Sequence, residues 1–239
     1  MSLARLLRFG ILLSCAVSAP AQADVLSVSS WSLATGVGSA GDGIGGLFEV
    51  VENPFSASQY FEYGPSAGST AYTAYNFAWS DSGGDFLIQA SHRAEDYDVR
   101  SSSNGFIRFT SIVDLLLTVE GSYTYDLPGG PMVVRVAVTA YDALTHDELF
   151  SQGFNDNTFL EGHAEGSVPL QGQALLPANR EISFNYTMHI DTLGSTGLIG
   201  SGDGFVHFTL QPIPEPSALA LLLLTALAVR RRPRQSQLF

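Results

Sequence analysis

The sequence has no lysine and a single cysteine, Cys15, which lies in an apolar N-terminal stretch. The rest of the chain therefore has neither a disulfide nor a thiol nucleophile. All 11 basic residues are arginines, and only five of them lie in residues 24–211, against 22 acidic residues. The net charge of about −17 on this segment repels nucleic-acid phosphates and anionic membranes. Nucleic-acid binding is excluded, and a solvated acidic surface is expected.

The sequence also lacks a full-length membrane span near its C-terminus. The apolar run 218–229 contains one polar side chain, Thr225. As a helix it would rise only about 18 Å, whereas the hydrocarbon core is about 30 Å thick. Upstream of it, Pro212, Pro214 and Pro216 prevent helix formation and keep the peptide extended. We expect a stiff, exposed peptide followed by a short helix that inserts transiently into the inner membrane.

The last residues form three parts in a fixed order. Pro214, Glu215 and Pro216 come first, and the apolar run 218–229 follows. The third part is an arginine cluster that would remain in the cytoplasm and stop further translocation of the chain. It consists of Arg230, Arg231, Arg232 and Arg234. Together they resemble the PEP-CTERM sorting signal of Gram-negative bacteria. The match covers residues 214–234, about a tenth of the chain.

The resemblance implies that an exosortase recognises this tail. It also implies export to the cell surface or the extracellular space, in association with exopolysaccharide and biofilm. The alternative is an ordinary tail-anchored helix that follows a proline-rich linker.

The N-terminus predicts a secretory signal peptide. Arg5 and Arg8 form a basic region, residues 6–17 are broadly apolar, and Ala21 and Ala23 form an A-x-A cleavage site. A competing interpretation makes Cys15 the acylated cysteine of a lipobox. We expect a signal peptide at 1–23, one folded body at 24–211 and the sorting signal at 212–239.

Alternating apolar residues predict strands almost throughout the body. Residues 181–191 place five apolar side chains on one face and five polar ones on the other, which is the period of a half-buried strand. Similar inward sets are expected at Tyr75, Phe77 and Trp79; Phe86, Ile88 and Ala90; Val134, Val136 and Val138; and Val206, Phe208 and Leu210. Glycine and proline turns separate these sets. The pattern predicts an all-β fold, a single antiparallel β-sandwich of jelly-roll type. Residues 35–46, 53–69 and 155–177 are expected to be loops.

Metal binding has weak candidates. Glu161, His163 and Glu165 alternate, so an extended backbone would place all three on one face. Neighbouring glycines favour an exposed acidic loop instead. Calcium in a loop at 95–98, or at Asp81 with Asp85, competes with the ordinary use of aspartate in turns. We expect no cofactor.

No catalytic constellation is visible in the sequence. Ser66 lies in a G-x-S-x-G pattern, but a nucleophile elbow needs a strand before it and a helix after it. His92, His189 and His207 are isolated, and we expect them to face solvent. The body is therefore predicted not to be an enzyme.

Three function hypotheses remain. The first is a non-catalytic surface or matrix protein delivered by the two terminal signals. The second is a carbohydrate-binding module that stacks sugars on aromatic side chains, with Tyr60, Phe61 and Tyr63 as the candidate cluster. The third is a secreted hydrolase, which would need a close pair of carboxylates in a groove.

Overall fold

The computed structural model describes residues 25–39, 47–50, 57–63, 68–80, 83–95, 98–157, 163–193 and 197–213. These residues form thirteen strands and no helix. Within them there is accordingly no helical segment with the length and apolarity to cross a bilayer. The predicted signal peptide, sorting motif and arginine cluster lie outside the described residues, as does Ser66.

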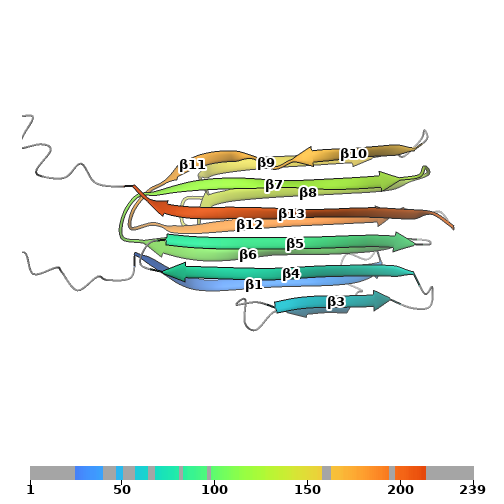
Figure 1. Ribbon diagram of the computed structural model, residues 1–239, viewed down its shortest axis with the longest axis horizontal. Helices are drawn as coiled ribbons and strands as arrows, with labels where there is room; N and C mark the ends of the chain where they lie inside the picture. The colour runs from blue at the N-terminus through green and yellow to red at the C-terminus, as the bar shows by residue number, and fades with distance from the viewer. Residues whose placement is uncertain are drawn as a thin grey trace, which may run out of the picture.

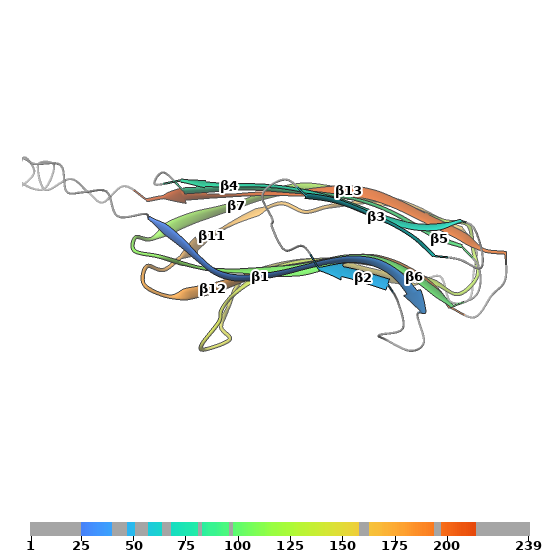
Figure 2. The ribbon, with the colours of Figure 1, turned by 90° about the horizontal axis from the view of Figure 1, so that it is seen from below.

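The strands form two sheets that pack face to face (Figures 1 and 2). Sheet A has the order β2 (Leu47–Val50), β1 (Leu26–Ser39), β6 (Val99–Ser111), β12 (Glu181–Thr192), β8 (Met132–Asp142) and β9 (Glu148–Asn157). Sheet B has the order β10 (Ala164–Pro169), β7 (Leu115–Leu127), β13 (Ile199–Pro212), β5 (Gly83–Glu95), β4 (Ser69–Ser80) and β3 (Ala57–Tyr63), and β11 (Gly172–Leu176) also pairs with β7. Every pairing is antiparallel, which confirms the predicted β-sandwich.

The core consists of the apolar side chains that the alternation predicts to point inward. Phe184 of sheet A stacks on Phe208 of sheet B with ring centroids 3.8 Å apart, and Phe208 stacks on Phe86 at 4.5 Å. All three rings are buried. Stacked aromatics of this kind bury large apolar areas and add ring–ring attraction. This stack joins the two sheets at the centre of the core.

Three segments expected to be loops contain strands. β3 lies within 53–69, β10 and β11 lie within 155–177, and β1 continues through the glycine-rich stretch as far as Ser39. Each segment pairs its backbone with a longer neighbour: β3 with β4, β10 and β11 with β7, and the end of β1 with β6. Pairing to a formed strand satisfies backbone groups without an alternating apolar pattern, so the local sequence gives little sign of it.

Both ends of the described body lie at the same end of the sandwich (Figure 1). The carbonyl of Val25 accepts a hydrogen bond from the Ile112 amide at 3.2 Å, and the Ile213 amide donates to the Asp114 carbonyl at 2.9 Å. The turn between β6 and β7 thus holds the first and last described residues. The first and last described residues therefore lie near each other.

Candidate functional site

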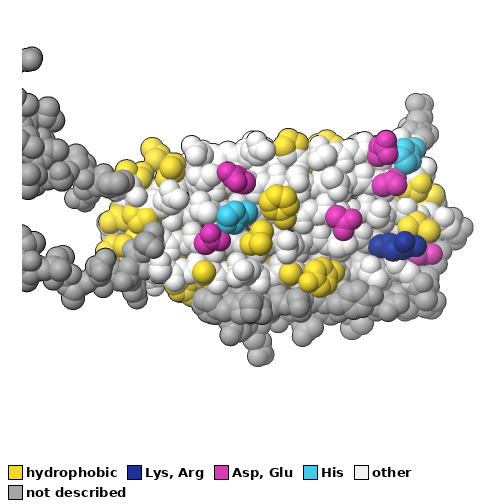
Figure 3. Space-filling view, in the orientation of Figure 1, with side chains coloured by type: hydrophobic (Ala, Val, Ile, Leu, Met, Phe, Trp, Pro, Cys, Tyr) yellow, Lys and Arg dark blue, Asp and Glu magenta, His cyan; other side chains and the backbone are white. Residues whose placement is uncertain are grey.

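The outward face of sheet B carries acidic, amide, hydroxyl and aromatic side chains. Space-filling shows several acidic patches and little basic surface on this face (Figure 3). Its described acidic residues include Asp85, Glu120, Asp126, Asp203 and Glu165, whereas Arg93 is the arginine on these strands. The described part of this surface is therefore mostly acidic in its charged side chains.

A groove opens on this face where the partner of β7 changes. β10 pairs with residues 122–127 of β7 and β11 pairs with residues 115–119, so Glu120 and Gly121 have no register partner in either strand. The Leu170 amide donates to the Gly121 carbonyl at 2.9 Å and holds the crossing between β10 and β11 in place. The groove encloses about 610 Å³, and its lining includes Thr118, Glu120, Ser122, Gln171, Gln173 and Phe205.

The lining combines one aromatic ring with many hydrogen-bonding groups. Phe205 is 40% exposed, which places it among the more open large apolar side chains of the described strands. The Gln173 amide donates to the Thr118 hydroxyl at 3.3 Å, which fixes one wall. Glu120 supplies a carboxylate, and Gln171 supplies an amide that both donates and accepts. An apolar ring beside convergent polar groups suits a ligand with one apolar face and hydroxyls around its rim.

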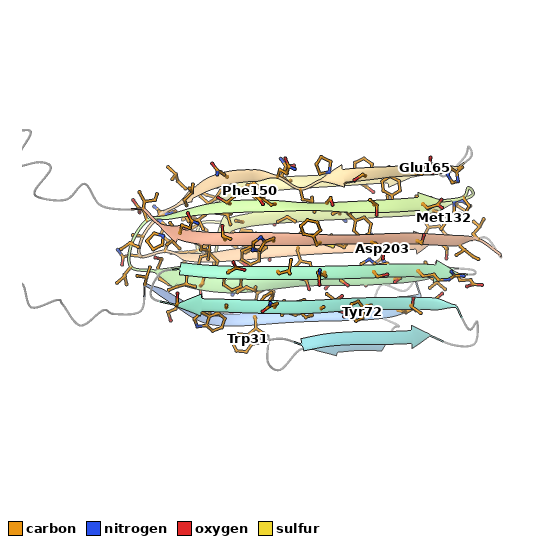
Figure 4. The ribbon with its side chains drawn as sticks, in the orientation of Figure 1. Trp31, Tyr72, Met132, Phe150, Glu165 and Asp203 are labelled. Atoms are coloured by element: carbon orange, nitrogen blue, oxygen red, sulfur yellow. The ribbon has the colours of Figure 1, made fainter. Side chains whose placement is uncertain are left out.

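The same face extends beyond the groove to a second aromatic residue. Tyr72 on β4 is 38% exposed and lies in the same register row as Asp203 on β13, with β5 between them (Figure 4). From strand spacing and rise, Tyr72 and Phe205 are about 12 Å apart along this diagonal. Two aromatic residues at that separation leave room for a chain-like ligand to lie across the strands.

His207 lies beside the groove, directly opposite Glu120 in the pairing of β13 with β7. Its Nε2 is 3.0 Å from Asp85 Oδ1 on the neighbouring strand β5. The ring is partly exposed on the outward face, as the alternation predicts. This pair ties two strands together at the edge of the groove.

The predicted metal residues are only partly brought together. Glu161 lies outside the described residues, while His163 lies between Glu165, with Nε2 to Oε2 at 3.4 Å, and Asp126, with Nδ1 to Oδ1 at 3.6 Å. Asp126 has no sequence proximity to the other two and was not a candidate. In the described part of the chain no group of three His, Cys, Asp or Glu side chains has the geometry to hold a metal. For the calcium candidates, Asp81 lies outside the described residues and Asp85 contacts His207.

The prediction that His92 faces solvent is wrong. β5 continues to Glu95, so His92 shares the inward parity of Ile88 and Ala90 and is 2% exposed. Its Nδ1 pairs with the Tyr123 hydroxyl at 2.8 Å, and its Nε2 pairs with the Ser103 hydroxyl at 2.8 Å. Burial, helped by His189, lowers the pKa of His92 from 6.5 to about 3, so the ring is neutral at pH 7.

Hydroxyl groups extend this contact across the core. Thr73 is hydrogen-bonded to Ser103 and to Thr35, the latter at 2.8 Å between the two hydroxyl oxygens. Thr35 also reaches the Tyr75 hydroxyl at 3.3 Å, and Tyr75 pairs with Tyr186 at 2.7 Å. The chain of hydrogen bonds alternates between the sheets. A serine beside a histidine has the spacing of a nucleophile and base, but Ser103 is fully buried, so the network links the sheets instead of meeting a substrate.

His189 lies on the outward face of sheet A, as expected, but is largely covered. Its side chain is 12% exposed, and its Nε2 is 3.7 Å from Asp191 Oδ2. Burial lowers the pKa of His189, which outweighs the raising effect of Asp191. Arg100 holds Asp191 through two hydrogen bonds of 2.8 and 2.7 Å, a bidentate pair across β6 and β12.

Sequence reasoning missed the groove and named a different aromatic cluster. Tyr60, Phe61 and Tyr63 form part of the edge strand β3, and their side chains lie outside the described set. Phe205 and Tyr72 alternate in parity with buried residues of their own strands. That alternation indicates two outward-facing aromatic residues, and it is the sequence signal that could have located the aromatic part of this face.

No family model matches the sequence, and no curated protein matches it. Among solved structures, an arabinose-bound MgGH51 α-L-arabinofuranosidase aligns with a TM-score of 0.24 and 12% identity over 64% of this chain, which spans 23% of the enzyme's length. A CBM4 structure aligns with a TM-score of 0.23 and 11% identity. The alignment covers 68% of this chain and 90% of the CBM4 chain. The VP2 subviral particle of infectious bursal disease virus aligns with a TM-score of 0.22 and 10% identity. The alignment covers 88% of this chain and 90% of the VP2 chain. TM-scores this low carry no argument about function.

Proposed function

We propose that the body is a non-catalytic, glycan-binding β-sandwich, and that the groove beside β7 is its binding site. The observation that carries this proposal is the groove's lining. An open phenyl ring, Phe205, faces the same space as the side chains of Gln171, Gln173 and Glu120. A pyranose ring has an apolar face that stacks on such a ring, while its hydroxyls pair with amides and carboxylates.

We further propose that the protein is exported and sorted by an exosortase to the cell surface or matrix, where exopolysaccharide is its partner. The terminal motifs support this proposal. The position of the last described residue is compatible with it, because Ile213 lies at one end of the sandwich and not on either of its broad faces. The strand arrangement is proposed to be of the jelly-roll type.

Affinity electrophoresis tests the binding site. The purified full chain should migrate more slowly in gels that contain a bound polysaccharide, tried first with neutral hydroxyethylcellulose and acidic alginate. Phe205→Ala should weaken that binding by about tenfold, because the variant loses the apolar contact area of the ring together with the about 0.5–1.5 kcal/mol that aromatic stacking adds beyond that area.

Leu144→Ala provides the matched control, since Leu144 is 87% exposed and lies far from the groove in the turn after β8. It should bind like the original protein. Equal binding by the Phe205→Ala variant would remove the groove as the site. No retardation by any acidic or neutral glycan would remove the proposed function.

A further inference from the structure

A second hollow lies on the opposite side of the molecule, at the hairpin between β8 and β9. It encloses about 210 Å³ and is lined by Thr139, Tyr141, His146 and Glu148. Thr139 and Tyr141 point outward from sheet A, because they alternate in β8 with Val138 and Ala140, which are buried in the core. The hairpin projects from the outer surface of sheet A, away from sheet B (Figure 2).

The hairpin is held in shape by one buried carboxylate. Asp142 Oδ1 accepts hydrogen bonds from the Leu144 and Thr145 amides at 2.9 and 3.0 Å, and Oδ2 accepts one from Arg180 at 2.9 Å. The His146 amide donates to the Asp142 carbonyl at 2.9 Å. This turn places His146 in the left-handed region, with φ of 61°. Non-glycine residues adopt that region only where their surroundings hold them there.

The result is an aromatic pair with polar groups beside it. The His146 and Tyr141 rings lie 6.2 Å apart at an angle of 47°, and Glu148 and Thr139 supply a carboxylate and a hydroxyl in the same hollow. This chemistry matches that of the groove on sheet B, where Phe205, Glu120 and Thr118 play the corresponding parts. The two hollows face opposite directions because they lie on the outer surfaces of different sheets.

We infer that the hollow at the β8–β9 hairpin is a second sugar-binding site, and that the protein cross-links polysaccharide chains. This inference rests on the proposed function of the groove. One chain that binds on each face joins two polymers through a single folded body. Two sites on one molecule also raise the apparent affinity for a polymer, since the second contact is made at a high local concentration.

Light scattering from mixtures of the full chain and the retarding polysaccharide tests the inference. Scattering should rise at intermediate protein-to-polymer ratios and fall again at protein excess, when separate protein molecules, each bound through one site, saturate every polymer chain. His146→Gly should abolish the rise while leaving retardation in the affinity gel measurable. This variant removes the imidazole without straining the backbone, because glycine accepts positive φ. Tyr141→Ala should act in the same direction, and Leu144→Ala should cross-link normally.

Each result decides between the two proposals. Retardation without a rise in scattering overturns the inference and leaves the groove intact. Full scattering with both His146→Gly and Tyr141→Ala also overturns it, because the cross-linking would then use other contacts. Complete loss of binding in the Phe205→Ala variant overturns it as well, since the second site should retain part of the affinity. Absence of retardation for the original protein overturns the proposed function itself.

Discussion

At the scale of single residues, His92 shows how a titratable group can serve as part of a core. Its two ring nitrogens pair with Tyr123 on β7 and Ser103 on β6, so the neutral ring satisfies hydroxyls from both sheets. A buried polar group without such partners would cost the free energy of its lost hydration. Here each nitrogen has one partner, and a neutral ring needs one to donate to and one to accept from.

The depressed pKa of His92 predicts that the protein loses stability in acid. The unfolded chain binds a proton near pH 6.5, while the folded chain binds it only near pH 3, so the unfolded state holds more protons between these values. The free energy of unfolding should therefore fall by about 1.4 kcal/mol for each pH unit below 6.5, down to about pH 3. Urea unfolding at pH 7, 5 and 4 measures this fall.

His92→Gln separates this effect from the titration of other groups. The amide keeps a donor and an acceptor but has no charge to gain in this range. The variant should be less stable than the original protein at pH 7, and its free energy of unfolding should decline less steeply with acid. His189, whose pKa is also lowered, contributes a slope of the same sign in both proteins. Identical slopes for the two proteins would contradict the prediction.

At the scale of elements, the β8–β9 hairpin depends on Asp142. Hydrogen bonds from the turn amides, together with Arg180, lower the pKa of Asp142 from 3.8 to about 2. Its contribution to stability is therefore complete above pH 3.8 and is lost as the pH falls toward 2. The alternation of Val134, Val136 and Val138 predicts strand β8, but nothing in the sequence pattern indicates that this carboxylate holds the amides of the turn after it.

Asp142→Ala should loosen the hairpin while the rest of sheet A stays protected. Hydrogen exchange at the Leu144 and Thr145 amides should become faster, because both lose their acceptor. Asp142→Asn keeps a side-chain oxygen for these amides and loses the charge that faces Arg180. Its exchange rates should therefore lie between those of the original protein and those of Asp142→Ala. Unchanged exchange at both amides in the alanine variant would show that the carboxylate does not hold the turn.

The strands differ in how well their sequences predict them. β12 has five apolar residues in strict alternation and was expected over 181–191, almost its full length. β10 reads Ala-Glu-Gly-Ser-Val-Pro and buries only Val168, so no apolar period marks it. Its pairing with β7 supplies the hydrogen bonds that make it a strand. The groove arises from the step between β10 and β11, and for that reason it too had no local signature.

At the scale of the whole molecule, the two broad faces differ in chemistry. Sheet B presents a mostly acidic outer surface with open aromatics, whereas the outer surface of sheet A carries Arg100, Arg108 and Arg135 beside acidic residues such as Glu181 and Asp191, and also the projecting hairpin. The proposed binding sites lie one on each face. The first and last described residues, Val25 and Ile213, lie together at one end of the sandwich.

Replacement of Pro214, Glu215 and Pro216 by alanines should block sorting in the native host. The unprocessed, membrane-associated form should accumulate, because an alanine stretch no longer presents a stiff, extended peptide to the proposed exosortase. Cell fractionation with mass spectrometry of the C-terminal peptide measures this. Alanines at Gln235, Ser236 and Gln237 serve as the control and should leave processing intact. Normal processing of the first variant, or an extracellular form that retains Phe239, would contradict the sorting assignment.

The sequence by itself determined which side of most strands faces the core and the acidic character of the body, because alternation and charge are local properties of the chain. The terminal signals stay a prediction. The tertiary structure decided which side chains meet. His92, Ser103 and Thr73 come from three strands and two sheets, and Phe205 reaches Gln171 and Glu120 only because β13 pairs with β7 where β10 gives way to β11. Such meetings depend on register and strand order, which are fixed by the packing of the whole core.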